Sequence, residues 1–458
     1  MNLRTGALWA ACLAVLFSLA FFVGASLPAA QAPQPSAQSQ QAQPGLPSAQ
    51  PVSPQPPAAQ PVTAYTLPPE LYRKARNLGR IRFRYAIISF FYGLVVLWIV
   101  LRCRLAPRFR DWAERCSPRR VLQVLIFSPL LILTIDILEI PTGIYDNWLS
   151  RKYGISVQGW ASWTWDWAKG EAISVIVGTI LIAILYAVIR RSPRRWWFYF
   201  WLASLPLLVF AIFLQPLIVD PLFHKFEPLA EKDPSLAAAL EQMARRAGEN
   251  IPQDRMFWMR ASEKSNAVDA YVTGIGSSKR IVVWDTAIAK MTTPEIVFAA
   301  GHEMGHYVLH HIVKLILFYA AAIFVFLALG YLCVGRMLAR WGSHWAIRGL
   351  DDWASLPALL LLLSIFSFAA DPATNAFSRY VEHQADQYGL EVTHGLTPDS
   401  GQVAAQAFEV LGVNNLADPR PNPVDVIWFY DHPPVSSRIR FCLSYDPWAK
   451  GGHGEFVP

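Results

Sequence analysis

The sequence predicts a mainly α polytopic membrane protein that carries an α+β region built from two polar segments. Of its 458 residues, 53% are hydrophobic and 16% are charged, which is too apolar for a soluble protein of this length. Several runs approach the roughly 20 apolar residues that a helix needs to cross a bilayer. We count about seven, of which the last is short enough to be re-entrant: 7–28, 85–102, 121–141, 172–190, 196–219, 312–334 and 355–370.

The first 68 residues divide into an apolar segment and a polar one. Residues 1–30 contain Arg4, an apolar stretch and then small residues, a pattern shared by signal peptides and retained first transmembrane helices. Both alternatives stay open. Residues 31–68 are rich in Pro, Gln, Ala and Ser, so they have little to bury, and we expect a disordered tether.

Residues 69–219 hold four of the apolar runs and therefore predict transmembrane helices. A Trp-rich loop is expected at about 142–171, and tryptophans near the ends of the runs are typical of aromatic belts at the lipid–water boundary. The formal net charge is +7, but many arginines gather in short loops such as 102–120 that flank apolar runs. Membrane topology explains these arginines, and we expect no nucleic-acid partner.

The region 220–311 is more polar and predicts a folded insert outside the bilayer. Ala267–Val272 and Ile281–Trp284 have the composition of two strands, and the glycines between them predict a hairpin. Thr293 as the N-cap and Pro294 at the first helical position then open a helix. This helix carries the motif described next.

The motif with the clearest chemistry is His302-Glu303-Met304-Gly305-His306. Histidines four residues apart lie on one face of a helix and can share a metal ion. Glu303 follows the first histidine and can take a proton from a water at that metal. This H-E-x-x-H pattern is typical of zinc peptidases, so we expect one Zn²⁺ per chain and Glu303 as general base.

A catalytic zinc usually has a third protein ligand, for which Glu382 is the best candidate. If its segment is helical, Glu382 and Asp386 share a face, so Asp386 can accept the free ring N–H of a ligand histidine. The alternative is a solvated helix with ordinary charge pairs. His310 and His311 permit a shifted site, but they lack an adjacent glutamate in the right place. They more simply mark where the helix enters the headgroup region.

Two further segments complete the organisation of the chain. Residues 312–370 hold the last two apolar runs and predict transmembrane helices, and 371–458 is a second polar region that contains Glu382. The polar regions 220–311 and 371–458 can meet on one face of the membrane. We therefore expect them to form a single catalytic domain.

Taken together, five ordered motifs resemble the type I CAAX prenyl protease family of integral-membrane zinc peptidases, over about residues 70–445. The motifs lie at Pro221–Leu229, Lys279–Thr286, His302–His306, Asn375–Asp386 and His432–Ile439. The resemblance implies membrane helices arranged around a large water-filled cavity, with a zincin-like domain that holds zinc at one end. Polar chemistry at membrane depth is tolerable only in such a cavity.

The resemblance also implies roles for single residues. His302, His306 and Glu382 are implied as zinc ligands, and Glu303 as the catalytic base. His432 is implied near the reaction centre, where it would stabilise the oxyanion of the tetrahedral intermediate. Without the resemblance, a histidine before two prolines is more simply a turn residue.

Other residues are implied in supporting and substrate-binding roles. Asn375 and Asp386 are implied to support the zinc ligands. The implied substrate-binding positions are Asp269, Ala270, Tyr271 and Arg438. Asp269 departs from the family pattern, which usually has Asn before the strand that pairs with the peptide. Backbone pairing can survive this change, and Asp269 alone reads as a turn residue.

Two other functions stay open beside this one. The first is a membrane quality-control metalloprotease of the HtpX type, and the second is a non-enzymatic membrane scaffold with a vestigial metal site. For the enzyme we expect a peptide or protein substrate, either lipid-linked or membrane-inserted, a bilayer around it and a monomeric chain.

The signal-like start favours the cytoplasmic (inner) membrane of a bacterium, with several passes. The arginine-rich loops at 102–120 and 190–195 favour a catalytic face outside the cytoplasm. Arg80, Arg82 and Arg84 favour the opposite orientation. The catalytic face is therefore left open.

Overall fold

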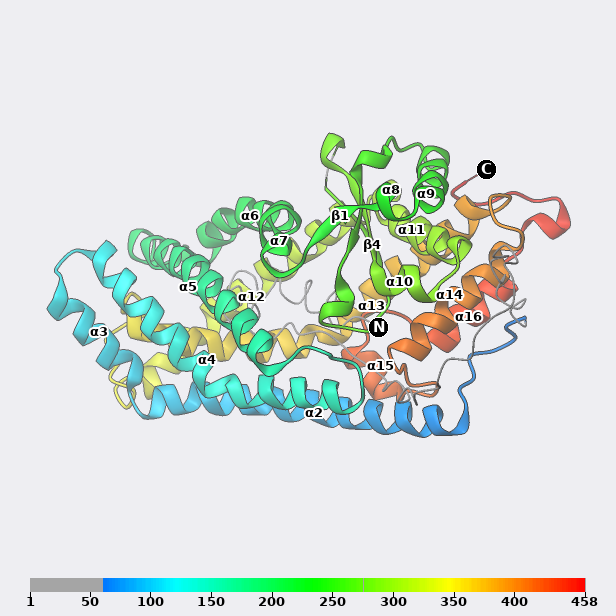
Figure 1. Ribbon diagram of the computed structural model, residues 1–458. Helices are drawn as coiled ribbons and strands as arrows, with labels where there is room; N and C mark the ends of the chain where they lie inside the picture. Colours follow the sequence, from blue (N-terminus) through cyan, green and yellow to red (C-terminus); the bar gives the residue numbers. More distant parts are fainter. Residues whose placement is uncertain (1–60, 275, 458) are drawn as a thin grey trace, which may run out of the picture.

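The computed structural model describes residues 61–274 and 276–457, so the first apolar run and most of the expected tether lie outside the described residues. The described chain is mainly helical (Figure 1). Its longer helices are α2 (Pro69–Arg102), α3 (Leu105–Cys116), α4 (Arg120–Lys152), α5 (Trp160–Arg191), α6 (Trp196–Leu214), α9 (Pro234–Arg246), α11 (Thr293–Val308), α12 (His311–Trp341), α13 (Leu356–Thr393), α14 (Ser400–Asn414) and α16 (Val435–Ser444). Its short helices are α7 (Asp220–Phe223), α8 (Leu229–Lys232), α10 (Asp285–Lys290) and α15 (Pro423–Phe429), and its strands are β1 (Phe226–Pro228), β2 (Met256–Met259), β3 (Ala270–Thr273) and β4 (Arg280–Trp284).

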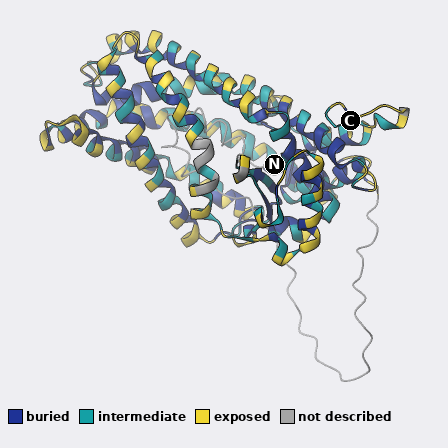
Figure 2. Ribbon diagram, turned by 90° about the horizontal axis from the view of Figure 1, so that it is seen from above, coloured by how far each residue is buried: buried dark blue, intermediate teal, exposed yellow. Residues whose placement is uncertain are grey.

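Five segments are long and apolar enough to cross a membrane: α2, α4, α5, α12 and the stretch Trp353–Thr393 that contains α13. Large aliphatic side chains on these segments are exposed, with Ile88 at 64% and Leu317 at 65%. Exposed stretches recur along the long helices (Figure 2). Such exposure is the expected state of lipid-facing residues. The described residues thus give five spans where seven were expected: the run 7–28 lies outside them, and the search of α6 covers only its apolar part Trp196–Phe210.

Two expected boundaries in the membrane region were wrong. The Trp-rich stretch at 142–171 is mostly helical, because α4 continues to Lys152 and α5 begins at Trp160. The run 355–370 is not re-entrant: it forms the first half of α13, which continues without a break to Thr393. Hydropathy changes halfway along α13, but the backbone hydrogen bonding of a helix does not depend on whether its surroundings are lipid or protein.

The region after α6 forms a four-stranded mixed sheet with the order β1-β2-β4-β3. β1 and β2 are antiparallel, β2 and β4 are parallel, and β3 and β4 form the expected antiparallel hairpin, with Ala270 opposite Val283. Among the described residues, no strand pairs with the outer side of β3. β3 is therefore an edge strand.

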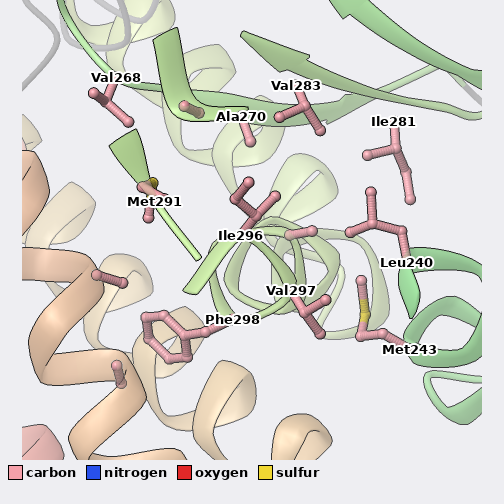
Figure 3. Packing of buried hydrophobic residues seen from close by; sticks show 14 of the residues in the cluster. Leu240, Met243, Val268, Ala270, Ile281, Val283, Met291, Ile296, Val297 and Phe298 are labelled. Atoms are coloured by element: carbon pink, nitrogen blue, oxygen red, sulfur yellow. The ribbon is translucent and has the colours of Figure 1, made fainter. Parts of the chain in front are cut away.

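Helix α11 lies against this sheet on one side and near α13 and α14 on the other (Figure 1). Its apolar residues Ile296, Val297 and Phe298 are buried in the same cluster as Val283 of β4 (Figure 3). The helix begins one residue earlier than expected: Thr292 is the N-cap, and its backbone N–H donates to Glu295 over 2.7 Å. This capping box fixes the start of the helix and so the direction in which it points its later side chains.

The N-terminal end of the described chain is tied to this domain. Val62 and Tyr65, which the sequence assigned to the tether, are buried, and Tyr65 donates to the carbonyl of Ala417. The backbone of Val62 exchanges two hydrogen bonds with the Gln402 side chain of α14. The expected tether therefore gives way to ordered, packed chain before residue 68.

Candidate metal centre

Helices α11 and α13 approach closely because glycines lie at their contact. A Cβ added to Gly389 of α13 would lie 3.1 Å from the backbone nitrogen of His302, and one added to Gly305 of α11 would lie 3.0 Å from Cβ of Tyr388. Both spacings are tighter than ordinary packing distances. The absent side chains let the two backbones come together, and this brings Glu382 of α13 to the histidines of α11.

Three side chains from these helices converge on one point. His302 Nε2 lies 3.4 Å from His306 Nε2 and 3.3 Å from Glu382 Oε2, and His306 Nε2 lies 3.5 Å from Glu382 Oε1. All three ligand atoms fit within 4.8 Å of one another. In the part of the chain that the structure describes, this is the one group of three or more His, Cys, Asp or Glu residues arranged to hold a metal ion.

The donor set of this group suits a zinc ion. Glu382 Oε2 is buried and has no hydrogen-bond partner among the described residues, although two histidine nitrogens lie nearby. Burial lowers the pKa of His306 to about 3, so its ring is neutral and keeps a nitrogen lone pair. Two imidazole nitrogens and a carboxylate that converge at these distances match the ligand set of a catalytic zinc site.

Asp386 and Arg438 lie behind His302. Asp386 Oδ1 accepts from His302 Nδ1 at 2.9 Å, and Arg438 donates to both carboxylate oxygens of Asp386, through Nε at 2.9 Å and Nη2 at 2.5 Å. Burial lowers the pKa of His302, but its contacts with Asp386 and Glu382 outweigh burial and raise it to about 10. The acceptor Asp386 Oδ1 keeps a proton on Nδ1 of His302, and this contact turns Nε2 toward Glu382.

His306 has a corresponding partner that the sequence reasoning missed. His311 Nδ1 lies 3.2 Å from His306 Nδ1, and His311 Nε2 lies 3.2 Å from the side-chain oxygen of Gln384. His311 is 0% exposed, so its ring faces the protein interior at the start of α12. In the sequence, His311 stands five residues after His306, a spacing that does not place two residues on one face of a helix. Only the turn between α11 and α12 shows that its side chain points toward His306.

Glu303 and His432 flank the same point. Burial raises the pKa of Glu303 to about 7, with a further contribution from the nearby charge of Asp269. His432 Nε2 lies 3.1 Å from Glu382 Oε2, and its Nδ1 donates to Asp431 at 2.9 Å. The site thus has a carboxylate near neutral pKa and an oriented imidazole beside the three converging ligand atoms.

The remaining predicted residues lie farther out. Asn375 donates to the carbonyl of Trp428 at 2.6 Å, and Arg379, one turn later on α13, donates to the carbonyls of Val426 and Tyr430. These bonds hold α15 and the segment that leads to His432. Ala270 and Tyr271 lie on the edge strand β3, directly after Asp269, and β3 packs against α11.

Comparison with known proteins agrees with this arrangement. The family model described as peptidase family M48 matches residues 230–445, and the model described as CAAX prenyl protease N-terminal, five membrane helices, matches residues 53–225. The chain belongs to peptidase family M48. Its M48 part contains both helices of the candidate metal centre, and the five-helix model covers the region before them.

Relatives of this M48 chain include proteins from bacteria and eukaryotes. It is 37% identical to the metalloprotease YhfN of Bacillus subtilis (strain 168) over 359 residues. This alignment covers 77% of this chain and 81% of YhfN. It is 25% identical to CAAX prenyl protease 1 of Saccharomyces cerevisiae over 395 residues. This alignment covers 81% of this chain and 85% of the yeast protein.

A solved structure has the same fold as this M48 chain. The crystal structure of S. mikatae Ste24p superposes with a TM-score of 0.70 at 24% identity and covers 82% of this chain and 89% of that one. The family models, the relatives and the five spans together identify a multi-pass integral-membrane metalloprotease of the CAAX prenyl protease family.

Proposed function

We propose that this metalloprotease is a zinc endopeptidase in which His302, His306 and Glu382 hold one Zn²⁺. The observation that carries the proposal is the convergence of two imidazole nitrogens and the unpartnered oxygen of Glu382 within 4.8 Å. Zinc bound there would supply a Lewis acid that polarises the scissile carbonyl and acidifies water. The protein residues around it would direct these effects to one peptide bond.

In this scheme, Glu303 moves the proton. A pKa of about 7 lets its carboxylate accept a proton from the attacking water and, once protonated, give that proton to the leaving amine nitrogen. Burial lowers the pKa of His432, but Glu382 and Asp431 outweigh burial and raise it above its ordinary value. The Nε2–H of His432 would then donate to the oxygen on which negative charge develops.

We propose that the substrate binds as an additional strand. β3 is the edge strand of the sheet formed by the described residues, and it packs against the helix that carries His302 and Glu303. A peptide paired with Ala270 and Tyr271 would cross the site through backbone hydrogen bonds alone, which gives little sequence selectivity. Asp269 would place a carboxylate beside such a peptide.

The proposed substrate class is a lipid-linked or membrane-inserted peptide or protein, processed by a monomeric enzyme. The relative from Saccharomyces cerevisiae bears the name CAAX prenyl protease 1, and the match to the model of five membrane helices favours this branch over an HtpX-type quality-control enzyme. Buried polar side chains within the spans, such as Asp136, Glu171 and Ser174, support a polar interior between the helices. We propose that this interior is a water-filled cavity and that the two polar regions form one zincin-like domain.

The decisive test measures zinc content and cleavage in the same preparations of purified full-length protein. We expect one zinc per chain in the wild type and in Glu303→Gln, which keeps the size of the side chain but removes the base. Cleavage of a reporter peptide by Glu303→Gln should fall by about 10²–10⁴-fold or more.

Glu382→Gln is the matched variant, because it removes the charge of a proposed ligand instead. It should lose zinc and activity together. Equal cleavage by wild type and Glu303→Gln would reject the role of Glu303, and an active protein free of metal would reject the whole scheme.

A further inference from the structure

His311 lies where a membrane helix begins, and it contacts a proposed metal ligand. Helix α11 ends at Val308, and His310 then adopts a left-handed conformation with φ of 55°. This conformation is uncommon for a residue other than glycine, and it stands between the end of α11 and the start of α12. As a result the side chain of His311, the first residue of α12, turns back beneath His306.

The hydrogen bonds of His311 have one consistent direction. The Gln384 oxygen only accepts, so Nε2 of His311 must carry the proton that it donates across 3.2 Å. A neutral His311 then has a lone pair on Nδ1, which accepts from Nδ1 of His306 at 3.2 Å. His306 with its proton on Nδ1 has its lone pair on Nε2, the atom that faces His302 and Glu382.

We infer that His311 and Gln384 are positioning residues that fix His306 in the tautomer able to bind the metal. This inference rests on the proposed zinc site. The ring of His302 is oriented in the same way by a hydrogen bond to Asp386, a charged acceptor. The ring of His306 is oriented by the neutral side chains of His311 and Gln384, which link α11, α12 and α13. Partners of this kind orient metal-binding histidines, and their loss typically weakens metal binding about 10–100-fold.

The test compares two replacements of His311 that separate hydrogen bonding from packing. Leucine preserves most of the buried volume but offers no acceptor, while asparagine is smaller and can place an oxygen near the position of Nδ1. We expect His311→Leu to weaken zinc binding about 10–100-fold and His311→Asn to stay near wild type. A packing role predicts the reverse order, and that order would overturn the inference.

The measurement is the zinc dissociation constant of the full-length detergent-solubilised protein, from competition with a chelator of known affinity. His310→Asn is the matched control, since His310 is exposed and asparagine tolerates its left-handed backbone. It should bind zinc as the wild type does. If His311→Leu fails to fold, Gln384→Glu and Gln384→Leu replace it: the first keeps an acceptor and should bind near normally, the second should not.

The outcomes separate this inference from the proposed function. A wild type that binds no zinc would reject the zinc site itself. A wild type that binds zinc, with His311→Leu or Gln384→Leu folded and equally tight, would reject only the positioning role.

Discussion

Arg438 contacts Asp386, which holds the proposed metal ligand His302. The sequence placed it among the substrate-binding residues, but its guanidinium forms two hydrogen bonds with Asp386 and lies 4.0 Å from the centre of the Phe408 ring. Asp386 is 1% exposed, so its charge depends on this partner. Arg438 therefore acts on His302 through Asp386.

We expect Arg438→Gln to destabilise the protein and weaken zinc binding, because it leaves the Asp386 carboxylate buried with only His302 as a partner. Breaking a buried ion pair on one side typically costs about 3–5 kcal/mol of folding free energy. Thermal unfolding and zinc affinity of the purified protein measure both effects. A variant with normal stability and zinc content but a raised KM for peptide would return Arg438 to substrate binding.

For single residues, the sequence could predict which side chains share one face of a helix. His302 and His306, and likewise Glu382 and Asp386, are four residues apart, so each pair shares a face wherever the helix lies. The zinc ligation by these residues stays a prediction. The contact of His311 with His306 could not be predicted, because it depends on the backbone conformation of a single residue, His310.

At the scale of helices, the metal centre depends on the close packing of α11 against α13. We expect Gly389→Ala to force these helices apart, because the new Cβ would meet the backbone nitrogen of His302 at 3.1 Å, and a backbone cannot rotate aside. Overpacking of this kind typically costs about 1–3 kcal/mol. Melting temperature and zinc affinity should both fall.

Gly335→Ala serves as the control for this substitution, since it lies within α12 with nothing within 4 Å of the added Cβ. It should leave both quantities unchanged or raise stability slightly, because alanine favours helices. An unchanged zinc affinity in a folded Gly389→Ala protein would show that the helix spacing does not control the metal centre.

Elements with a strong local pattern were predictable, and elements whose pattern changes along their length were not. The β3–β4 hairpin was found from its strand composition and its glycines. The helix of residues 356–393 was divided at about 370, because its first half is apolar and its second half is polar. The composition of a segment depends on whether it faces lipid, protein or water. The continuity of a helix depends on its backbone hydrogen bonds, which are the same in all three surroundings.

At the scale of the whole molecule, three arginine-rich segments between membrane helices lie together at one end. The segment 102–120, which contains α3, has seven arginines, 190–195 has four, and 336–352 has three. They contact one another: Arg104 donates to the carbonyl of His344, and Arg190 to that of Asp351. The catalytic helices lie at the opposite end of the membrane helices (Figure 1).

This arrangement predicts the orientation in the membrane. Short basic loops stay in the cytoplasm, so we expect the catalytic end outside it. The arginines that favour the opposite orientation, Arg80, Arg82 and Arg84, are three, against fourteen in the three basic segments. In bacterial cells, alkaline phosphatase fused after residue 458 should be active, and the same reporter fused within 342–352 should be inactive. The opposite pattern would place the catalytic site in the cytoplasm.

The continuity of α13 has a consequence for how this protein can evolve. Ile365 faces outward in the first half of the helix, and Glu382 lies in the second half with no loop between them. One inserted or deleted residue would turn everything after it by about 100° around the helix axis and shift it by about 1.5 Å. Lineages can lengthen surface loops freely, but between these two positions every viable descendant must inherit the same number of residues.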